Sequence, residues 1–141
     1  MIKNLNEYFK PEIGIFLDAI NYKRKDESIK ESKDSVSLLC QDNITISLEG
    51  ENVRIIVTRS VSLKPNEIFN LTVSFGADLR FNERRAEYDW EKINLAEEFV
   101  ENGEFITTQL VSRIALIIGE ITSSYGQQPL MLPPVLAKKN N

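Results

Sequence analysis

Two pairs of neighbouring carboxylates are the residues best suited to chemistry in this chain of 141 residues. Asp89 lies two positions before Glu91, and Glu97 directly precedes Glu98. Such pairs serve as general acids and bases, or they bind Mg²⁺. The sequence has no glycine-rich phosphate loop and no histidine, which excludes a Ser–His or Cys–His nucleophilic pair. We therefore interpret the carboxylates as solvated charges, and we predict a protein that is not an enzyme and needs no cofactor.

The single cysteine and the basic residues suggest no further site. Cys40 alone cannot form an intramolecular disulfide or a thiolate metal cage, so no metal site is predicted. Its place on the apolar side of an alternating pattern favours a small buried hydrophobic residue over a reactive thiol. Arg80, Arg84 and Arg85 form a small basic cluster, but glutamates interleave with it and the net charge is −4. Nucleic-acid binding is therefore not expected.

Length and hydropathy are those of a globular protein. The chain is 42% hydrophobic and 27% charged, which fits a single domain over residues 1–141. The first eleven residues lack the continuous apolar stretch of a signal peptide. The longest apolar run, residues 114–118, is far shorter than the roughly 20 residues of a spanning helix. We expect a cytoplasmic protein without membrane insertion.

The first half of the chain carries strand signals. Residues 13–22 are rich in β-branched and aromatic types and predict a first strand. The mixed-charge run 23–34 predicts a solvated loop, with a functional role as the alternative. Apolar and polar residues then alternate over residues 36–48, where Asp42 interrupts the apolar side. This segment is either one half-buried strand or two short strands broken near Gln41.

A hairpin and a turn connect the later strands. Residues 49–52 predict a tight hairpin, after which alternation resumes over residues 53–63 with Arg59 as the exception on the apolar side. Residues 64–67 contain a proline and predict a turn. The cleanest alternation runs over residues 69–81. One face of the sheet is therefore expected to pack on an apolar layer, and the other to face water or a polar partner.

Helical signals follow the strands. Asn94 is the predicted N-cap of a short helix over residues 95–102, which Gly103 ends. A longer helix is predicted over residues 104–125, and its apolar stripe has the helical period. The stripe consists of Ile106, Leu110, Ile114, Ile117, Ile118 and Ile121. Strands followed by helices predict an α+β fold, with a four-stranded antiparallel sheet and a short and a long C-terminal helix packed on one face.

Phe105 and Leu116 project away from the apolar stripe of the long helix. A helix on a sheet needs only one apolar face, so something else must cover this second patch. Cover by the N-terminal segment or the tail and cover by a helix of another subunit both remain open. After the helix, Gly126 and the following prolines exclude further helix and predict an extended apolar segment over residues 126–136.

The strands at residues 43–81 and the ending at residues 112–134 resemble the SecB family of protein-export chaperones. That family has a four-stranded antiparallel sheet, a short helix, a long C-terminal helix and a closing apolar segment that contains prolines. Its closing segment typically has a glycine, a proline after a few residues, and apolar residues that end in proline. The matching positions here are Gly126, Pro129, Leu130, Leu132 and Pro133. The resemblance extends over residues 13–134.

The resemblance implies an ATP-independent chaperone, a holdase that binds unfolded polypeptide segments in apolar grooves during protein export. SecB relatives are homotetramers built as dimers of dimers. The implied partners are unfolded client proteins, together with the SecA motor or an antitoxin, and the protein is expected to form a dimer or tetramer. The alternative is a SecB-fold adaptor, or a toxin–antitoxin-associated chaperone, that binds one specific partner.

The resemblance also implies where clients and subunits bind. The candidate peptide-binding residues are Trp90, Ile93, Phe99, Leu130, Met131 and Leu132. For each of them, ordinary core packing is the alternative. Phe105 and Leu116 are the candidate oligomer interface.

Overall fold

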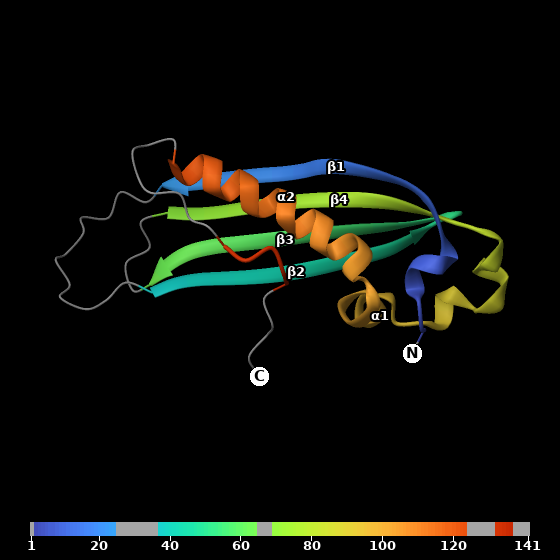
Figure 1. The fold of residues 1–141 in the computed structure, drawn as a ribbon. Coiled ribbons are helices and arrows are strands. Elements are labelled where there is room, and N and C mark those ends of the chain that lie inside the picture. Colours follow the sequence, from blue (N-terminus) through green and yellow to red (C-terminus); the bar gives the residue numbers. More distant parts are fainter. Residues whose placement is uncertain (1, 25–36, 65–68, 124–131, 137–141) are drawn as a thin grey trace.

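The computed structural model of the chain describes residues 2–24, 37–64, 69–123 and 132–136 (Figure 1). It confirms the predicted α+β fold, because four antiparallel strands are followed by a short helix and a long helix. The strands are β1 (Phe9–Arg24), β2 (Ser37–Glu49), β3 (Asn52–Lys64) and β4 (Phe69–Phe81), and the helices are α1 (Leu95–Asn102) and α2 (Glu104–Ser123). Three short 3₁₀ helices complete the fold: η1 (Leu5–Tyr8), η2 (Glu83–Glu87) and η3 (Trp90–Lys92).

The strands form one sheet in the order β1-β4-β3-β2, so β1 and β2 are the edges. The first strand is longer than predicted, since it runs from Phe9 to Arg24. Pro11 fits near its start because the pairing register with β4 shifts there and an edge strand tolerates a missing N–H donor. Lys23 and Arg24, predicted to begin the charged loop, instead continue the pairing with β4. Residues 25–34 of that loop lie outside the described residues.

A two-residue turn joins β2 to β3 as the sequence predicts. Glu49 pairs with Asn52 across the turn, and Gly50 adopts a positive φ of 63°, which glycine accepts without strain. Of the two alternatives for residues 36–48, the structure has one continuous strand, and Asp42 pairs within it. The turn predicted at residues 64–67 falls mostly outside the described residues, although Lys64 itself ends β3.

Alternation in β4 creates the core. All seven apolar residues at the odd positions of β4 are buried, and α2 packs on them through most of its predicted stripe. Figure 1 shows α2 crossing the sheet diagonally, from a start near α1 to an end over β1. The N-terminal residues Ile2, Leu5 and Tyr8 are buried in the same core, which the sequence pattern did not predict.

Both ends of α1 follow the sequence signals. The Asn94 side-chain oxygen accepts a hydrogen bond from the main-chain N–H of Glu97 at 3.3 Å, which caps the first turn. Gly103 donates its main-chain N–H to the Phe99 carbonyl at 3.0 Å, and a Cβ at this glycine would lie 2.3 Å from the same oxygen. Only glycine therefore fits between the two helices. The predicted end of α2 at residue 125 lies outside the described residues, and the helix is described up to Ser123.

The face of the sheet away from the helices is lined by polar cross-strand pairs. The hydroxyls of Thr58 and Ser74 are 2.8 Å apart, and Arg54 donates to both carboxylate oxygens of Asp78 at 2.8 and 3.1 Å. Phe16 is the aromatic exception. Its ring lies against Gly76, where an added Cβ would come within 2.4 Å of the ring.

Candidate functional site

Two opposite charges lie side by side on the helix-facing side of the sheet. Asp42 of β2 and Arg59 of β3 are register partners, and each interrupts the apolar side of its strand. Nε and Nη2 of Arg59 donate to the two carboxylate oxygens of Asp42, each at 2.8 Å. Both side chains are 2% exposed. The planar guanidinium matches the carboxylate in this two-bond geometry, so the fold buries a fully formed ion pair.

Residues 132–136, here called the strap, lie over this ion pair. Nη1 of Arg59 donates to the carbonyl of Pro133 at 2.9 Å, and Nη2 also donates to the carbonyl of Val135 at 2.7 Å. The chain bends at Pro134 and Val135, so the described end of the segment that was predicted as extended over residues 126–136 is not extended. Among the described residues these are the only hydrogen bonds of the strap. Figure 1 shows the strap crossing in front of β3 and β2 where α2 does not cover them.

The ion pair and the strap carbonyls form a satisfied polar network. The hydrogen bonds that Arg59 donates to Asp42 raise the pKa of Arg59, whereas burial lowers it, so the guanidinium stays charged. In the described part of the chain no buried side-chain nitrogen or oxygen lacks a hydrogen-bond partner. The Asp42–Arg59 pair as a whole carries no net charge. The N–H groups of Arg59 that do not bind Asp42 are the donors to the strap carbonyls.

A cleft of about 880 Å³ opens beside the strap, between β2 and the two helices. Its size is within the range of about 300–1,000 Å³ that is typical of ligand sites. Ile44 of β2, Val100 of α1 and Leu136 of the strap contribute apolar walls. Carboxylates from α1 and from the first turn of α2 line the other side. The cleft therefore combines apolar surface with an acidic rim, and Val135 and Leu136 of the strap form one of its sides.

The carboxylate pairs do not assemble a catalytic group in the described structure. Asp89 forms an ion pair with Lys92 at 3.6 Å, and Glu98 accepts a hydrogen bond from the main-chain N–H of Ile2 at 3.1 Å. No three His, Cys, Asp or Glu side chains of the described ranges gather to hold a metal ion. Cys40 is half-buried, and that burial raises the pKa of its thiol.

The structure of the chain is similar to solved structures of other proteins. The chain matches a SecB-like chaperone from Mycobacterium tuberculosis, solved in complex with an antitoxin peptide, with a TM-score of 0.70 and 12% identity over 93% of this chain and 90% of that one. The chain has a SecB-like fold. It also matches a protein of unknown function from Streptococcus agalactiae with a TM-score of 0.37 and 14% identity, over 86% and 97% of the two chains. No protein-family model and no curated protein matches the sequence.

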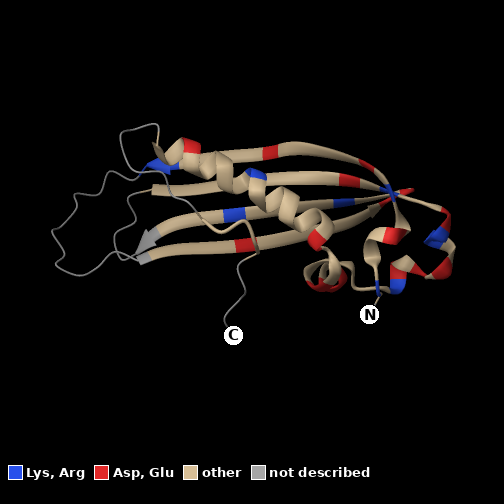
Figure 2. Ribbon diagram, in the orientation of Figure 1, with Lys and Arg blue, Asp and Glu red and all other residues tan. Residues whose placement is uncertain are grey.

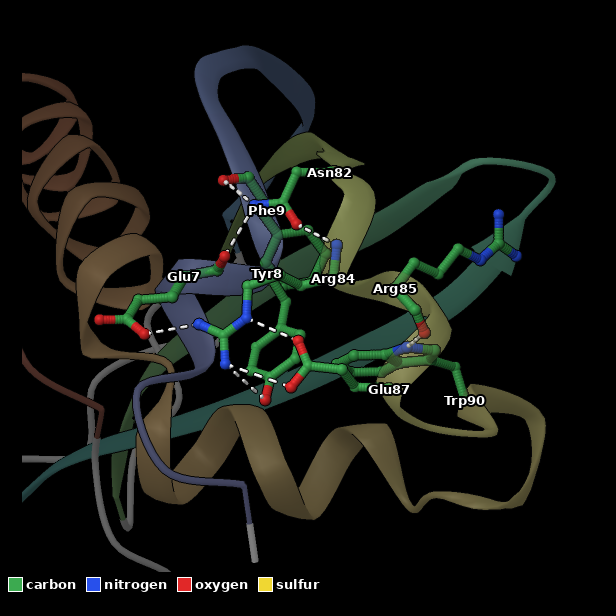
Figure 3. Close-up of polar contacts among 8 residues, drawn as sticks. All are labelled: Glu7, Tyr8, Phe9, Asn82, Arg84, Arg85, Glu87 and Trp90. Atoms are coloured by element: carbon green, nitrogen blue, oxygen red, sulfur yellow. Dashed lines mark hydrogen bonds and ion pairs between the residues drawn. The ribbon is translucent and has the colours of Figure 1, made fainter.

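In this SecB-like fold, two of the candidate peptide-binding residues lie in the core. Trp90 is 3% exposed and Phe99 is fully buried, and the rings of both contact Phe9. Figure 3 shows the Trp90 indole, whose Nε1 donates to the main-chain carbonyl of Arg85 at 2.8 Å. Neither side chain can contact a client unless the core opens. In the structure of the free chain, both side chains therefore pack in the core, which was the alternative for each of them.

The other candidate peptide-binding residues are spread over separate parts of the SecB-like fold. Ile93 is half-buried beside the core, and Leu132 is half-buried at the start of the strap. Leu130 and Met131 lie outside the described residues. Of the four candidates that the structure describes, Trp90 and Phe99 are buried while Ile93 and Leu132 are half-buried, and the client contacts of Ile93 and Leu132 stay a prediction.

An exposed network ties the N-terminus to η2 (Figure 3). Arg84 donates to Glu7 and to Glu87, each at 2.7 Å, and its guanidinium lies 4.5 Å from the ring centre of Tyr8. The hydrogen bond that Arg84 donates to the Glu87 carboxylate lowers the pKa of Glu87. The network fixes the segment that encloses Trp90, and it presents no reacting group.

The two candidate interface residues have different surroundings. Phe105 is half-buried, and its ring lies 6.3 Å from that of Phe9 and 6.2 Å from that of Phe99, so the start of β1 and helix α1 cover part of it. Leu116 is 69% exposed. The second apolar patch of α2 is thus covered within the chain at its N-terminal end and open further along. Its role in an oligomer stays a prediction.

Sequence reasoning missed the pairing of Asp42 with Arg59. Both residues were noted as separate interruptions of apolar alternation, and neither was taken as a candidate site residue. The available signal was that they carry opposite charges on the two arms of one predicted hairpin. It could not have identified the strap as their third partner, because the strap is more than 70 residues away in sequence.

Proposed function

We propose that the protein is an ATP-independent chaperone that holds unfolded polypeptide segments. The observation that carries this proposal is the number of large apolar side chains left exposed on a SecB-like fold. Contiguous exposed apolar surface marks sites that bind other chains, and three of these side chains, Leu17, Ile20 and Tyr22, follow one another along the helix-facing side of β1. Those on the helix-facing side of the sheet, the helices and the strap are Leu17, Ile20, Tyr22, Leu38, Val100, Leu116 and Val135.

The fold comparison supports the same function. The Mycobacterium tuberculosis chaperone of this fold was solved with an antitoxin peptide, so the architecture can present a peptide-binding surface. Holding a client through apolar contacts needs no nucleotide and no catalytic group. We place the protein in the cytoplasm, where it would hold clients before their export. The alternative is an adaptor that binds one specific partner, and the antitoxin complex favours it as the second candidate.

We also propose that a second copy covers part of the apolar surface. Leu116 points away from the sheet, while Leu17 and Ile20 lie along the free edge strand β1. An 18-residue window of α2 has a mean hydropathy of 1.3 yet is only 44% buried. By length and composition α2 could cross a membrane, but core helices of soluble proteins pass the same test. A helix from another copy would satisfy this surface, so we expect a dimer or tetramer.

The function is tested by aggregation suppression without nucleotide. Several unrelated unfolded proteins are diluted into buffer with the chain, and light scattering is followed. We expect suppression at near-stoichiometric oligomer, and its loss in Val100→Asp, which places a charge in the cleft. Leu39→Asp is the control, because Leu39 is also exposed but lies on the face of β2 that is turned away from the helices and the cleft.

Each outcome separates the two candidate functions. Suppression of all substrates supports a general holdase, whereas binding of only one partner supports the adaptor. Absence of suppression at a large excess of the chain rules out the holdase. The oligomer is measured separately by sedimentation of wild type and Leu116→Asp, and identical masses for both would reject the proposed role of Leu116.

A further inference from the structure

Residues 2–8, here called the lid, cover one side of Trp90. The apolar residues Ile2, Leu5 and Tyr8 of the lid are buried, whereas its polar residues are exposed. The centre of the Tyr8 ring lies 5.5 Å from that of the Trp90 ring, and the two rings meet edge to face. The burial of Trp90 therefore depends in part on a short segment at the start of the described chain.

A bulge separates the lid from the rest of β1. Phe9 pairs with Phe81, and the next register pair is Ile13 with Leu79. Residues 10–12 lie between these two pairs and are exposed. Such a bulge interrupts the hydrogen-bond ladder locally. The backbone before Ile13 can therefore move without breaking the pairing of β1 with β4 that follows.

Two residues directly after β4 hold the end of the lid, and Figure 3 shows both of them. The main-chain N–H of Asn82 donates to the Tyr8 carbonyl at 3.0 Å, and its side-chain nitrogen donates to the Glu7 carbonyl at 2.7 Å. Arg84 donates to the Glu7 carboxylate at 2.7 Å and to the Tyr8 hydroxyl at 3.3 Å. We call Asn82 and Arg84 the clasp, because they tie the lid to the body of the fold.

The forces on the lid are nearly balanced. Burial of three apolar side chains favours the closed form, whereas fixing the backbone of seven residues opposes it, and the two contributions are of similar size. The clasp therefore determines how often the lid opens. Figure 2 shows acidic and basic residues close together at this end of the molecule. The side chains of Arg84 and Glu7 are 43% and 51% exposed, and an exposed ion pair shifts an equilibrium by at most about fivefold.

We propose that the lid opens as a unit about the bulge, that the clasp holds it closed, and that its opening uncovers Trp90 while the sheet stays paired. The sequence predicts Trp90 as a client contact, but the closed lid keeps its side chain from any other chain. An opening lid removes this conflict without unfolding the core. The use of the uncovered surface by clients rests on the proposed chaperone function and deepens it, because the lid would regulate how much apolar surface is available.

The lid is tested by native-state hydrogen exchange of the full chain, followed by NMR. The amides of Glu7 and Phe9 donate to carbonyls of the lid, and the amide of Asn82 donates to Tyr8, so all three report on its opening. Segments that open locally exchange faster than segments that open only on global unfolding. We expect one common protection factor for the three amides, about tenfold or more below that of the β4 amides.

Substitutions in the clasp and in the lid sharpen this test. Arg84→Gln removes the ion pair with Glu7 and should raise exchange of the three lid amides about five- to tenfold, with β4 unchanged. Arg54→Gln is the matched control, because Arg54 also forms an exposed two-bond pair, but with Asp78 on the opposite face of the sheet. Leu5→Ala truncates a fully buried side chain and should raise lid exchange about a hundredfold.

The exchange rates decide whether the lid exists. Equal protection of the lid and β4 amides would mean that the lid opens only with the whole core, which overturns the proposal. Equal effects of Arg84→Gln and Arg54→Gln on the lid amides would reject the clasp. If Leu5→Ala does not fold, wild type and Arg84→Gln decide by the same comparison.

Aggregation suppression separates the lid from the function on which its use rests. If Arg84→Gln suppresses aggregation at a lower concentration than wild type, while Arg54→Gln matches wild type, regulation by the lid is supported. Unchanged suppression by a variant with faster lid exchange would overturn that regulation and leave the holdase intact. If wild type does not suppress aggregation at all, the holdase fails, and the exchange rates still decide whether the lid opens.

Discussion

Removing one partner of the buried Asp42–Arg59 pair should destabilise the protein strongly. Breaking a buried ion pair from one side costs about 3–5 kcal/mol, because the other charge stays buried without compensation. For Asp42→Asn we expect about 3 kcal/mol, since the strap carbonyls still accept two bonds from the guanidinium. For Arg59→Met we expect about 5 kcal/mol, because the carboxylate and both strap carbonyls lose their donors.

The sheet provides a matched control on its other face. Arg54 and Asp78 are also register partners on adjacent strands and also form two hydrogen bonds, at 2.8 and 3.1 Å. Their side chains are 40% and 35% exposed, against 2% for each member of the buried pair. Exposed pairs contribute about 0–1 kcal/mol, so Asp78→Asn should cost less than about 1 kcal/mol. The difference between the two substitutions isolates burial.

The measurement is urea unfolding at fixed protein concentration, followed by the fluorescence of Trp90, the only tryptophan. With a slope of about 2 kcal/mol per molar urea, Asp42→Asn should lower the midpoint by about 1.5 M. The double variant Asp42→Asn with Arg59→Met should cost about 2 kcal/mol less than the sum of the single changes, because no buried charge remains. Equal costs for the buried and exposed pairs, or additive single changes, would refute the reasoning.

Three further outcomes follow from packing and burial. Gly76→Ala should cost about 1–2 kcal/mol more than Gly14→Ala in thermal unfolding, because its Cβ meets the Phe16 ring at 2.4 Å while the space around Gly14 is open; equal costs would contradict this. Trp90→Ala should cost about 3–5 kcal/mol in urea unfolding, since the side chain is 3% exposed. This variant is followed by circular dichroism, because it lacks the fluorescent probe, and a cost below about 1 kcal/mol would show that Trp90 is not a core residue. Burial raises the pKa of the Cys40 thiol above its ordinary value of 9.0. At pH 7, iodoacetamide should therefore alkylate Cys40 more slowly in the folded than in the urea-unfolded protein, and the rate in the folded protein should rise only at alkaline pH. Equal rates for the two states would reject the burial effect.

The elements with strong local signals were predictable from the sequence. The bounds of β4 and α1 were predicted at Phe69–Phe81 and Leu95–Asn102, and the structure has both. Unbroken alternation determined the first, and an asparagine cap with a glycine stop determined the second. The first strand was predicted too short because its ends carry Pro11, Lys23 and Arg24, which have weak strand propensity and are held there by pairing with β4.

The buried ion pair was within reach of the sequence, but the strap contact was not. In a hairpin with a two-residue turn, positions at equal distance from the turn are partners. Asp42 is seven residues before Glu49, and Arg59 is seven residues after Asn52, so the turn alone fixes their pairing. The positions of Trp90 and Phe105 could not be predicted, because their partner Phe9 comes from an N-terminal segment that has no periodic pattern.

The dimensions of the elements explain why such a fold has surface available for other chains. A strand of 13 residues is about 43 Å long, and four strands span about 19 Å across the sheet. Helix α2, with 20 residues, is about 30 Å long and about 10 Å wide, so it covers less than half of one sheet face. The remainder must be covered by the N-terminal segment, α1, the strap or another polypeptide. The apolar residues that stay exposed on this face lie on the edge strands, as Leu17 and Ile20 of β1 and Leu38 of β2. Arg59, paired with Asp42 on the same face, supplies two hydrogen bonds to the main chain of the strap, which covers a further part of the sheet.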